Sequence, residues 1–201
     1  MRYDIPVAQH RVEQTIDRSR FICTIAPVDS TEAAQGFVRA MNAEFAVATH
    51  NCWAYVIGAP GSTDRIGMSD DGEPHGTAGR PMLTVLLHSG VGDIAAVVTR
   101  YYGGTKLGTG GLVKAYGGTV ALALQSLSRK PRVDWVHADV TVSYASIGAL
   151  ALLWPQFDIE VLRETYEADA RFSVRIPEEL VEAARAAILD ATRGQALFVL
   201  G

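Results

Sequence analysis

The glycine-rich segment of residues 100–111, R-Y-Y-G-G-T-K-L-G-T-G-G, constrains this chain more than any other part of its sequence. It follows an apolar run at residues 94–98 that is typical of a buried strand, and it leads into a helical pattern that begins L-V-K-A-Y. Glycine permits positive φ angles and close backbone approach, and a helix N-terminus offers free N–H groups and a positive dipole end. The order of strand, glycine-rich turn and helix therefore predicts a site for an anion.

The cations of this segment and the next turn are Arg100, Lys106 and Lys114, with Thr109 as the expected helix cap. The segment matches neither a Walker A loop nor the GxGxxG dinucleotide fingerprint, so nucleotide binding of those types is not indicated. The alternative is a tight turn whose glycines serve packing alone. The residues predicted to bind phosphate or RNA, with the two tyrosines stacking on bases, are Arg100, Tyr101, Tyr102, Gly103, Gly104, Lys106, Gly108, Gly110, Gly111 and Lys114.

A second polar segment, S-D-D-G-E-P-H-G-T-A-G-R-P, occupies residues 69–81. Its carboxylates and imidazole can bind a divalent cation or transfer protons, but the spacing is not that of an EF-hand loop. Asp-Gly and Glu-Pro also form solvated turns, and Asp70 or Asp71 can pair with Arg80 or Arg100. We expect a binding surface or a turn, with no metal and no catalytic residue. The residues assigned to it are Asp70, Asp71, Gly72, Glu73, His75, Gly76 and Thr77.

The segment T-H-N-C-W-A-Y at residues 49–55 carries a possible nucleophile and base. His50 and Cys52 are two residues apart, so in a strand they share one face. A lone buried cysteine is more often a small core residue, and we favour that interpretation. Trp53 and Tyr55 share the opposite face and are expected in the core.

Hydrophobic periodicity predicts a mixed α+β chain of two domains, residues 1–130 and 131–201. The second domain has the pattern βαββαβ of a ferredoxin-like fold, with its first helix ending at Pro155. In the first domain, Asp29 or Ser30 is expected to cap a helix. The remaining expected elements are an extended region at 12–28, strands at 52–57 and 94–99, helices from 82 and 112, and a linker at 128–132.

Charge and cysteine content limit the possible partners and compartments. Residues 1–130 carry a net charge of +1 and residues 131–201 carry −5, so a polyanion should prefer a local patch in the first part. The chain lacks the bulk positive charge that would favour DNA. Two cysteines make no disulfide framework, and neither a signal peptide nor a membrane span is apparent. We expect a cytoplasmic protein.

The three segments, together with S-R-F-I at residues 19–22, closely resemble the IMPACT (YigZ) family in order and spacing over residues 15–128. The resemblance implies a first domain similar to the second domain of a small-subunit ribosomal protein. It implies a second domain similar to the C-terminal domain of elongation factor G. Eukaryotic relatives regulate translation through an extra N-terminal domain, which we expect to be absent here.

The resemblance implies a translation-associated regulator without a cofactor, most simply a non-enzymatic one, that binds RNA, ribosomes or a translation-related protein. The alternative is an enzyme or sensor that acts on a small phosphorylated ligand with Mg²⁺ held by Asp70, Asp71 or Glu73. A third possibility is a protein-docking module in which both polar segments form one face. Fold similarity alone does not choose among them.

Overall fold

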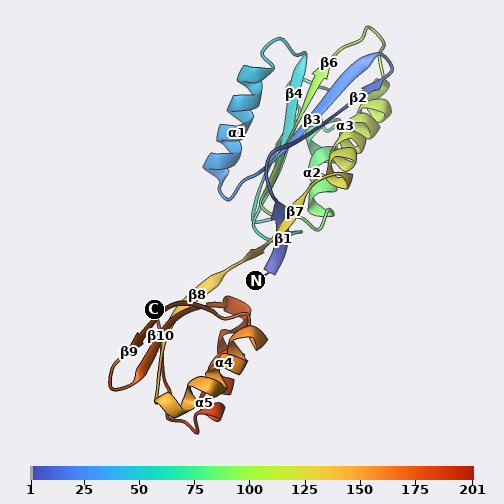
Figure 1. Ribbon diagram of the computed structural model, residues 1–201. Coiled ribbons are helices and arrows are strands. Elements are labelled where there is room, and N and C mark those ends of the chain that lie inside the picture. Colours follow the sequence, from blue (N-terminus) through green and yellow to red (C-terminus); the bar gives the residue numbers. More distant parts are fainter. Residues whose placement is uncertain (1) are drawn as a thin grey trace. The chain divides into compact units, whose positions relative to one another are not determined.

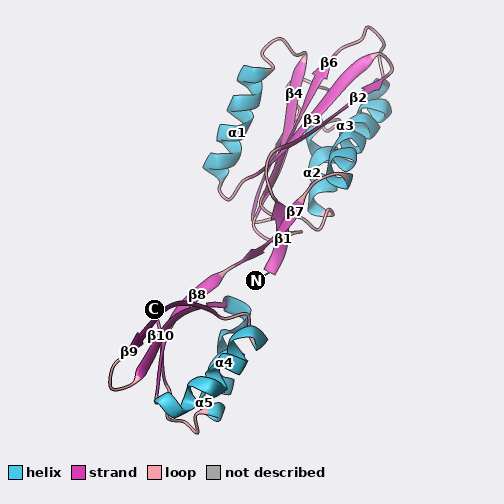
Figure 2. Cartoon of the chain, viewed as in Figure 1, coloured by secondary structure: helices cyan, strands magenta, loops and turns pink. Residues whose placement is uncertain are grey.

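The computed structural model describes residues 2–201, which divide into two compact units of mixed helices and strands. One unit comprises residues 3–132, and the other comprises residue 2 with residues 133–201. Figure 1 labels the elements and Figure 2 distinguishes helices from strands. Within residues 2–201, no helix is both long and apolar enough to cross a membrane.

The unit of residues 3–132 is built on an antiparallel five-stranded sheet with the strand order β2-β3-β6-β4-β5. The central strand β6 is buried along nearly its whole length, because helices cover both faces of the sheet. This explains why its sequence is a continuous apolar run without alternation. The strands are β2 (His10–Ile16), β3 (Ser19–Pro27), β4 (His50–Ile57), β5 (Arg65–Ser69) and β6 (Ile94–Tyr101).

Helix α1 (Thr31–Glu44) lies on one face of this sheet, and α2 (Gly79–Leu87) and α3 (Gly108–Gln125) lie on the other (Figure 1). Successive side chains of β4 point to opposite faces of the sheet, so this strand contributes to the hydrophobic core on each face. Cys52 belongs to the larger core beneath α2 and α3, whereas Tyr55 belongs to the core under α1, with its ring 5.7 Å from that of Trp53. The predicted core placement is confirmed for Tyr55, and Trp53 packs half-buried against the same core.

Of the two predicted caps of α1, Ser30 is the one that the structure shows, because its hydroxyl accepts the N–H of Ala33. Two other local predictions in this unit are wrong. Helix α3 already begins at Gly108, so Thr109 lies inside its first turn and cannot cap it. The predicted linker is the strand β7 (Arg129–Val133), which pairs with β1 (Arg2–Pro6) in a two-stranded sheet. This strand was not predicted, because it is rich in charged residues and has no alternating apolar pattern.

The second unit has the element order βαββαβ and an antiparallel sheet ordered β11-β8-β10-β9, which is the ferredoxin-like arrangement. Helices α4 and α5 cover one sheet face (Figure 2). Helix α4 continues through Pro155 to Gln156 and ends one residue after the proline, so the predicted end at Pro155 is early by one residue. The elements are β8 (Trp135–Val142), η1 (Tyr144–Ser146), α4 (Ile147–Gln156), β9 (Glu160–Tyr166), β10 (Ala170–Pro177), η2 (Glu178–Leu180), α5 (Val181–Ala191) and β11 (Leu197–Leu200).

Candidate functional site

The carboxylate of Asp70 shapes the acidic loop between β5 and α2. It accepts the backbone N–H groups of Gly76 at 2.7 Å, Ala78 at 3.1 Å and Gly79 at 2.9 Å. Two of these donors lie at the start of α2, where intrahelical partners are missing. Burial works against the charged form, but the three backbone donors outweigh it and lower the pKa of Asp70 below its usual range. Asp70 is therefore a structural acceptor in this loop.

We expect Asp70→Asn to lower the free energy of unfolding by about 2–3 kcal/mol near neutral pH, because an amide replaces a charged acceptor of three N–H groups. The folded-state pKa is depressed, so this stabilisation is complete above the unfolded pKa of about 3.9 and is lost as pH falls through the folded value. The difference between wild type and variant should then shrink below about pH 4. Urea unfolding at a series of pH values measures it, with the exposed Asp64→Asn as control. A pH-independent difference would contradict this role.

Asp71 and its neighbours fasten the loop to the end of β4. The carboxylate of Asp71 accepts the backbone N–H of Asn51 at 2.6 Å, and its carbonyl oxygen lies 2.7 Å from Nδ1 of His50. The Sγ of Cys52 donates to the carbonyl oxygen of Asp70 at 2.9 Å, so His50 and Cys52 do share one face. The predicted pairing of Asp70 or Asp71 with Arg80 or Arg100 is wrong, because backbone donors occupy both carboxylates.

Neither cysteine has the environment of a nucleophile. Burial raises the pKa of Cys23 to about 12 and raises that of Cys52 further, so both thiols stay protonated near neutral pH. Both are free and buried. The interpretation of Cys52 as a core residue is the one the structure supports.

A buried ion pair joins the two polar segments. Oε1 of Glu73 accepts Nη1–H of Arg100 at 2.6 Å and the hydroxyl of Tyr116 at 2.7 Å. The side chains of Glu73 and Arg100 are 3% and 6% exposed, so the pair is shielded from solvent. Burial, followed by Cys52 and Glu73, raises the pKa of Tyr116, which keeps its hydroxyl a donor. His50 Nε2 lies 3.9 Å from the same Glu73 oxygen.

Arg100 is enclosed by residues from three segments. Its Nη2 donates to Ser19 Oγ at 3.4 Å, and its guanidinium lies 5.5 Å from the ring centroids of both Phe21 and Tyr102. Its Nε is buried without a hydrogen-bond partner among residues 2–201. The guanidinium is thus held by contacts within the protein, and Arg100 also lines the pocket that lies above it.

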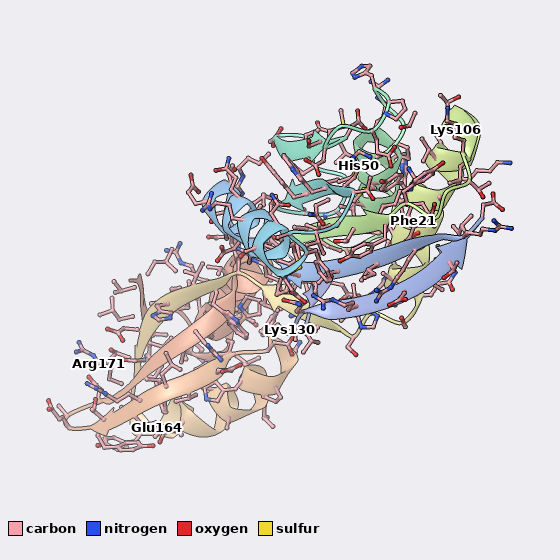
Figure 3. The ribbon with its side chains drawn as sticks, turned by 90° about the horizontal axis from the view of Figure 1, so that it is seen from above. Phe21, His50, Lys106, Lys130, Glu164 and Arg171 are labelled. Carbon is pink, nitrogen blue, oxygen red and sulfur yellow. The ribbon has the colours of Figure 1, made fainter. Side chains whose placement is uncertain are left out.

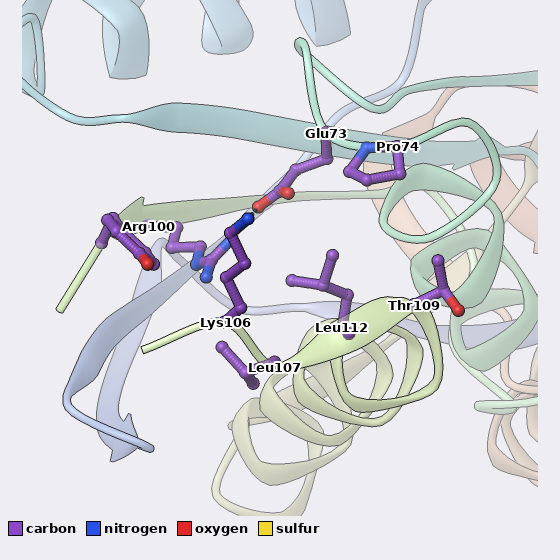
Figure 4. A pocket seen from close by; sticks show the side chains of 9 residues that line it. Glu73, Pro74, Arg100, Lys106, Leu107, Thr109 and Leu112 are labelled. Carbon is purple, nitrogen blue, oxygen red and sulfur yellow. Dashed lines mark hydrogen bonds and ion pairs between the residues drawn. The ribbon is translucent and has the colours of Figure 1, made fainter. Parts of the chain in front are cut away.

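A pocket of about 370 Å³ opens above this ion pair, and both polar segments line it. Figure 4 shows Glu73 pointing toward Arg100 from the acidic loop, while the Lys106 side chain extends toward the same point from the glycine loop. Apolar side chains make up much of the remaining wall. The lining residues are Glu73, Pro74, Arg100, Tyr102, Lys106, Leu107, Gly108, Thr109 and Leu112.

Helix α3 starts at the rim of this pocket without a side-chain cap and with no acidic residue in its first turn. Lys106 lies just before that helix and is exposed, as Figure 3 shows where it is labelled. Lys114 is also exposed, but it lies in the second turn of α3 and does not line the pocket. The backbone N–H groups of the first turn of α3, which have no intrahelical acceptor, and the Lys106 ammonium together give this rim a positive electrostatic potential.

The other predicted residues take supporting places. Gly103 packs against the turn between β2 and β3, and its N–H donates to Ser19 Oγ at 3.2 Å. Gly104 and Gly108 have φ values of +85° and +70°, which only glycine adopts readily. Tyr101 stands beneath the guanidinium of Arg20 at 5.5 Å. Gly72, Gly110 and the imidazole of His75 are exposed, and Gly76 and Gly111 are half-buried. Thr77 is buried.

Three further residues, Ser19, Phe21 and Tyr116, belong to the site although no sequence motif marks them as site residues. Phe21 packs edge-on against Tyr116 with ring centroids 5.4 Å apart, and both support the Glu73–Arg100 pair. Their periodicity is that of ordinary core residues, so a single sequence gives no reason to separate them from the core. The only available signal was their position inside the S-R-F-I and L-V-K-A-Y segments.

Comparison with known proteins places the chain in a family. The sequence model of the Impact N-terminal domain matches residues 17–124, which include both polar segments and most of the sheet. The chain belongs to the IMPACT family. A second model, a domain of unknown function named DUF1949, matches residues 140–195 of this IMPACT family chain.

Full-length relatives agree with this assignment. The chain is 44% identical over 190 residues to IMPACT family member YigZ of Escherichia coli, covering 94% of this chain and 93% of that protein. It is 36% identical over 198 residues to an IMPACT family member of Haemophilus influenzae, with 98% and 96% covered. A crystal structure described as that of a hypothetical protein shares 42% identity and a TM-score of 0.68, over 98% of this chain and 96% of that one.

Proposed function

We propose that this IMPACT family protein is a translation-associated regulator that binds RNA, alone or in ribosomes, through the rim of the pocket above Glu73 and Arg100. One observation carries the proposal: the exposed Lys106 and the uncapped start of α3 lie together at a pocket mouth. Backbone N–H groups and lysine are the usual ligands of nucleic-acid phosphates. Membership of the IMPACT family fits a role in translation.

The rest of the proposal follows the family resemblance. The two units would act as separate domains, similar to the second domain of a small-subunit ribosomal protein and to the C-terminal domain of elongation factor G. The protein would work in the cytoplasm without catalysis. The buried pair of Glu73 and Arg100 would hold the two loops in register, and Lys106 and Lys114 would contact phosphates.

Changing Lys106 and Lys114 together to Ala should weaken binding of a single-stranded RNA by about tenfold or more and flatten its salt dependence. Each phosphate contact on a single strand contributes about 0.7 to the slope of log K against log salt, so the slope should fall by about 1.4. Fluorescence anisotropy at several salt concentrations measures both quantities. Lys130→Ala, at an exposed lysine of β7, is the matched control. An unchanged affinity and slope in the double variant would reject this rim as the RNA site.

A second candidate is a sensor or enzyme for a small phosphorylated ligand, because the pocket volume of about 370 Å³ lies in the range of small-ligand sites. The Mg²⁺ part of that idea has weak support. Asp70 and Asp71 accept backbone N–H groups, Glu73 accepts Arg100 and Tyr116, and residues 2–201 hold no cluster of three metal-ligating side chains. Calorimetric titration of nucleotides with and without Mg²⁺ separates the candidates: heat that requires Mg²⁺ would favour the second.

A further inference from the structure

One oxygen of Glu73 remains available to a ligand. Oε1 is saturated, because it accepts both Arg100 and Tyr116. Oε2 makes no hydrogen bond within residues 2–201, although the side chain is only 3% exposed and Glu73 lines the pocket. An ionised carboxylate only accepts hydrogen bonds, so Oε2 presents an unused acceptor at the pocket floor. An unpaired carboxylate oxygen that lines a pocket favours a ligand that brings N–H donors to it.

The rest of the pocket describes the other parts of that ligand. Pro74, Leu107 and Leu112 provide apolar surface, and the 46% exposed Tyr102 provides an aromatic ring at the wall. Lys106 and the uncapped start of α3 provide positive charge at the mouth. A flat body with a donor edge at one end and an anionic group at the other fits these three regions. An unstacked nucleotide has that form.

We propose that the pocket binds a single unstacked guanine of an RNA strand, with its Watson–Crick edge on Glu73. This inference rests on the proposed RNA binding and names the base that the site selects. Oε2 of Glu73 accepts the base N–H groups, Tyr102 stacks on the ring, and Lys106 with the α3 amides holds the adjoining phosphate. Stacking on an aromatic ring contributes to binding with every base, so Tyr102 gives affinity and Glu73 gives selectivity.

The choice of guanine follows from the order of donors and acceptors along each base edge. Guanine presents two adjacent donors, N1–H and the N2 amino group. Adenine, cytosine and uracil each place an acceptor directly beside their donor. A carboxylate repels such an acceptor, and the two donors that hydrogen-bond to Glu73, Arg100 Nη1 and the Tyr116 hydroxyl, are both engaged with Oε1. Guanine also has an acceptor, O6, on the other side of N1–H, but it alone of the four bases offers two adjacent donors to the carboxylate.

Short uridine oligomers with one central G, A or C, and the all-uridine oligomer, test the inference on wild-type protein at one salt concentration. Fluorescence anisotropy should show the guanine oligomer bound about tenfold more tightly than the others. Glu73→Gln keeps an oxygen for Arg100 and Tyr116 and replaces the free acceptor by an amino group, so the preference should vanish in the folded variant. Tyr102→Ala, at a half-exposed side chain, should weaken binding to all four oligomers about equally.

The possible outcomes separate this inference from the function on which it rests. Equal affinity of wild type for the four oligomers, with the salt slope still dependent on Lys106 and Lys114, would overturn guanine selection and leave RNA binding standing. No binding of any oligomer would reject both. A guanine preference that survives in Glu73→Gln, with circular dichroism showing a native fold, would overturn the role of Glu73. The wild-type comparison needs no variant, so it decides the question even where Glu73→Gln fails to fold.

Discussion

Glu73→Ala is expected to lower the free energy of unfolding of the unit of residues 3–132 by about 3–5 kcal/mol, which is typical of breaking a buried ion pair. The residue Arg100 is 5% exposed, and the variant would leave its guanidinium with one long hydrogen bond to Ser19. The rings of Phe21 and Tyr102 cannot replace a carboxylate, and Nε already lacks a partner. The variant would also leave the buried hydroxyl of Tyr116 without an acceptor.

Chemical unfolding followed by tryptophan fluorescence and circular dichroism measures this loss. The matched control is Glu13→Ala, because Glu13 and Arg20 form an ion pair of the same kind on the exposed faces of β2 and β3, with side chains 47% and 51% exposed. Solvent screens that pair, so its loss should matter far less. Combining Glu73→Gln with Arg100→Met removes both charges and should recover much of the stability lost by Glu73→Ala. A Glu73→Ala variant no less stable than Glu13→Ala would show that the buried pair stabilises nothing.

Strong local patterns made much of the fold predictable. Alternating residues in 136–144 and 170–176 predicted two central strands of the second unit, and the apolar run at 94–98 predicted β6. Strand β7 was missed, because R-K-P-R-V is charged and its pairing with β1 depends on residues more than 120 positions away. Strand β5 was missed too, since an edge strand of five residues containing Gly67 carries little periodicity.

The candidate site was predictable in composition but not in the roles of its acids. The two polar segments were predicted to form one site, and they do line one pocket. The sequence does not indicate which of Asp70, Asp71 and Glu73 pairs with Arg100, because side-chain length and loop geometry decide that choice. The two aspartates bond to backbone amides close to them, and only the longer Glu73 reaches across to β6. An exposed-looking run of acids therefore contains one buried carboxylate.

The glycines of the opening segment differ sharply in what they contribute, and substitution should separate them. A Cβ added to Gly103 would lie 1.9 Å from the carbonyl oxygen of Arg18 and 2.6 Å from the backbone nitrogen of Ser19. Both are backbone atoms of the tight turn between β2 and β3, so no side-chain rotation relieves the clash. We expect Gly103→Ala to destabilise the unit by about 3 kcal/mol or more, at the upper end for an overpacked site.

Gly110→Ala is the matched control within the same segment. Gly110 lies in the first turn of α3 without a positive φ, and nothing lies within 4 Å of an added Cβ. Alanine there should raise stability by about 0.5–1 kcal/mol, since it restricts the unfolded chain and favours the helix. Thermal unfolding of both variants measures the opposite signs. Equal changes in stability for the two variants would contradict the expected clash between an added Cβ at Gly103 and the β2–β3 turn. Opposite effects would show that Gly103 is required for its close packing against Arg18 and Ser19, whereas Gly110 has room for a side chain.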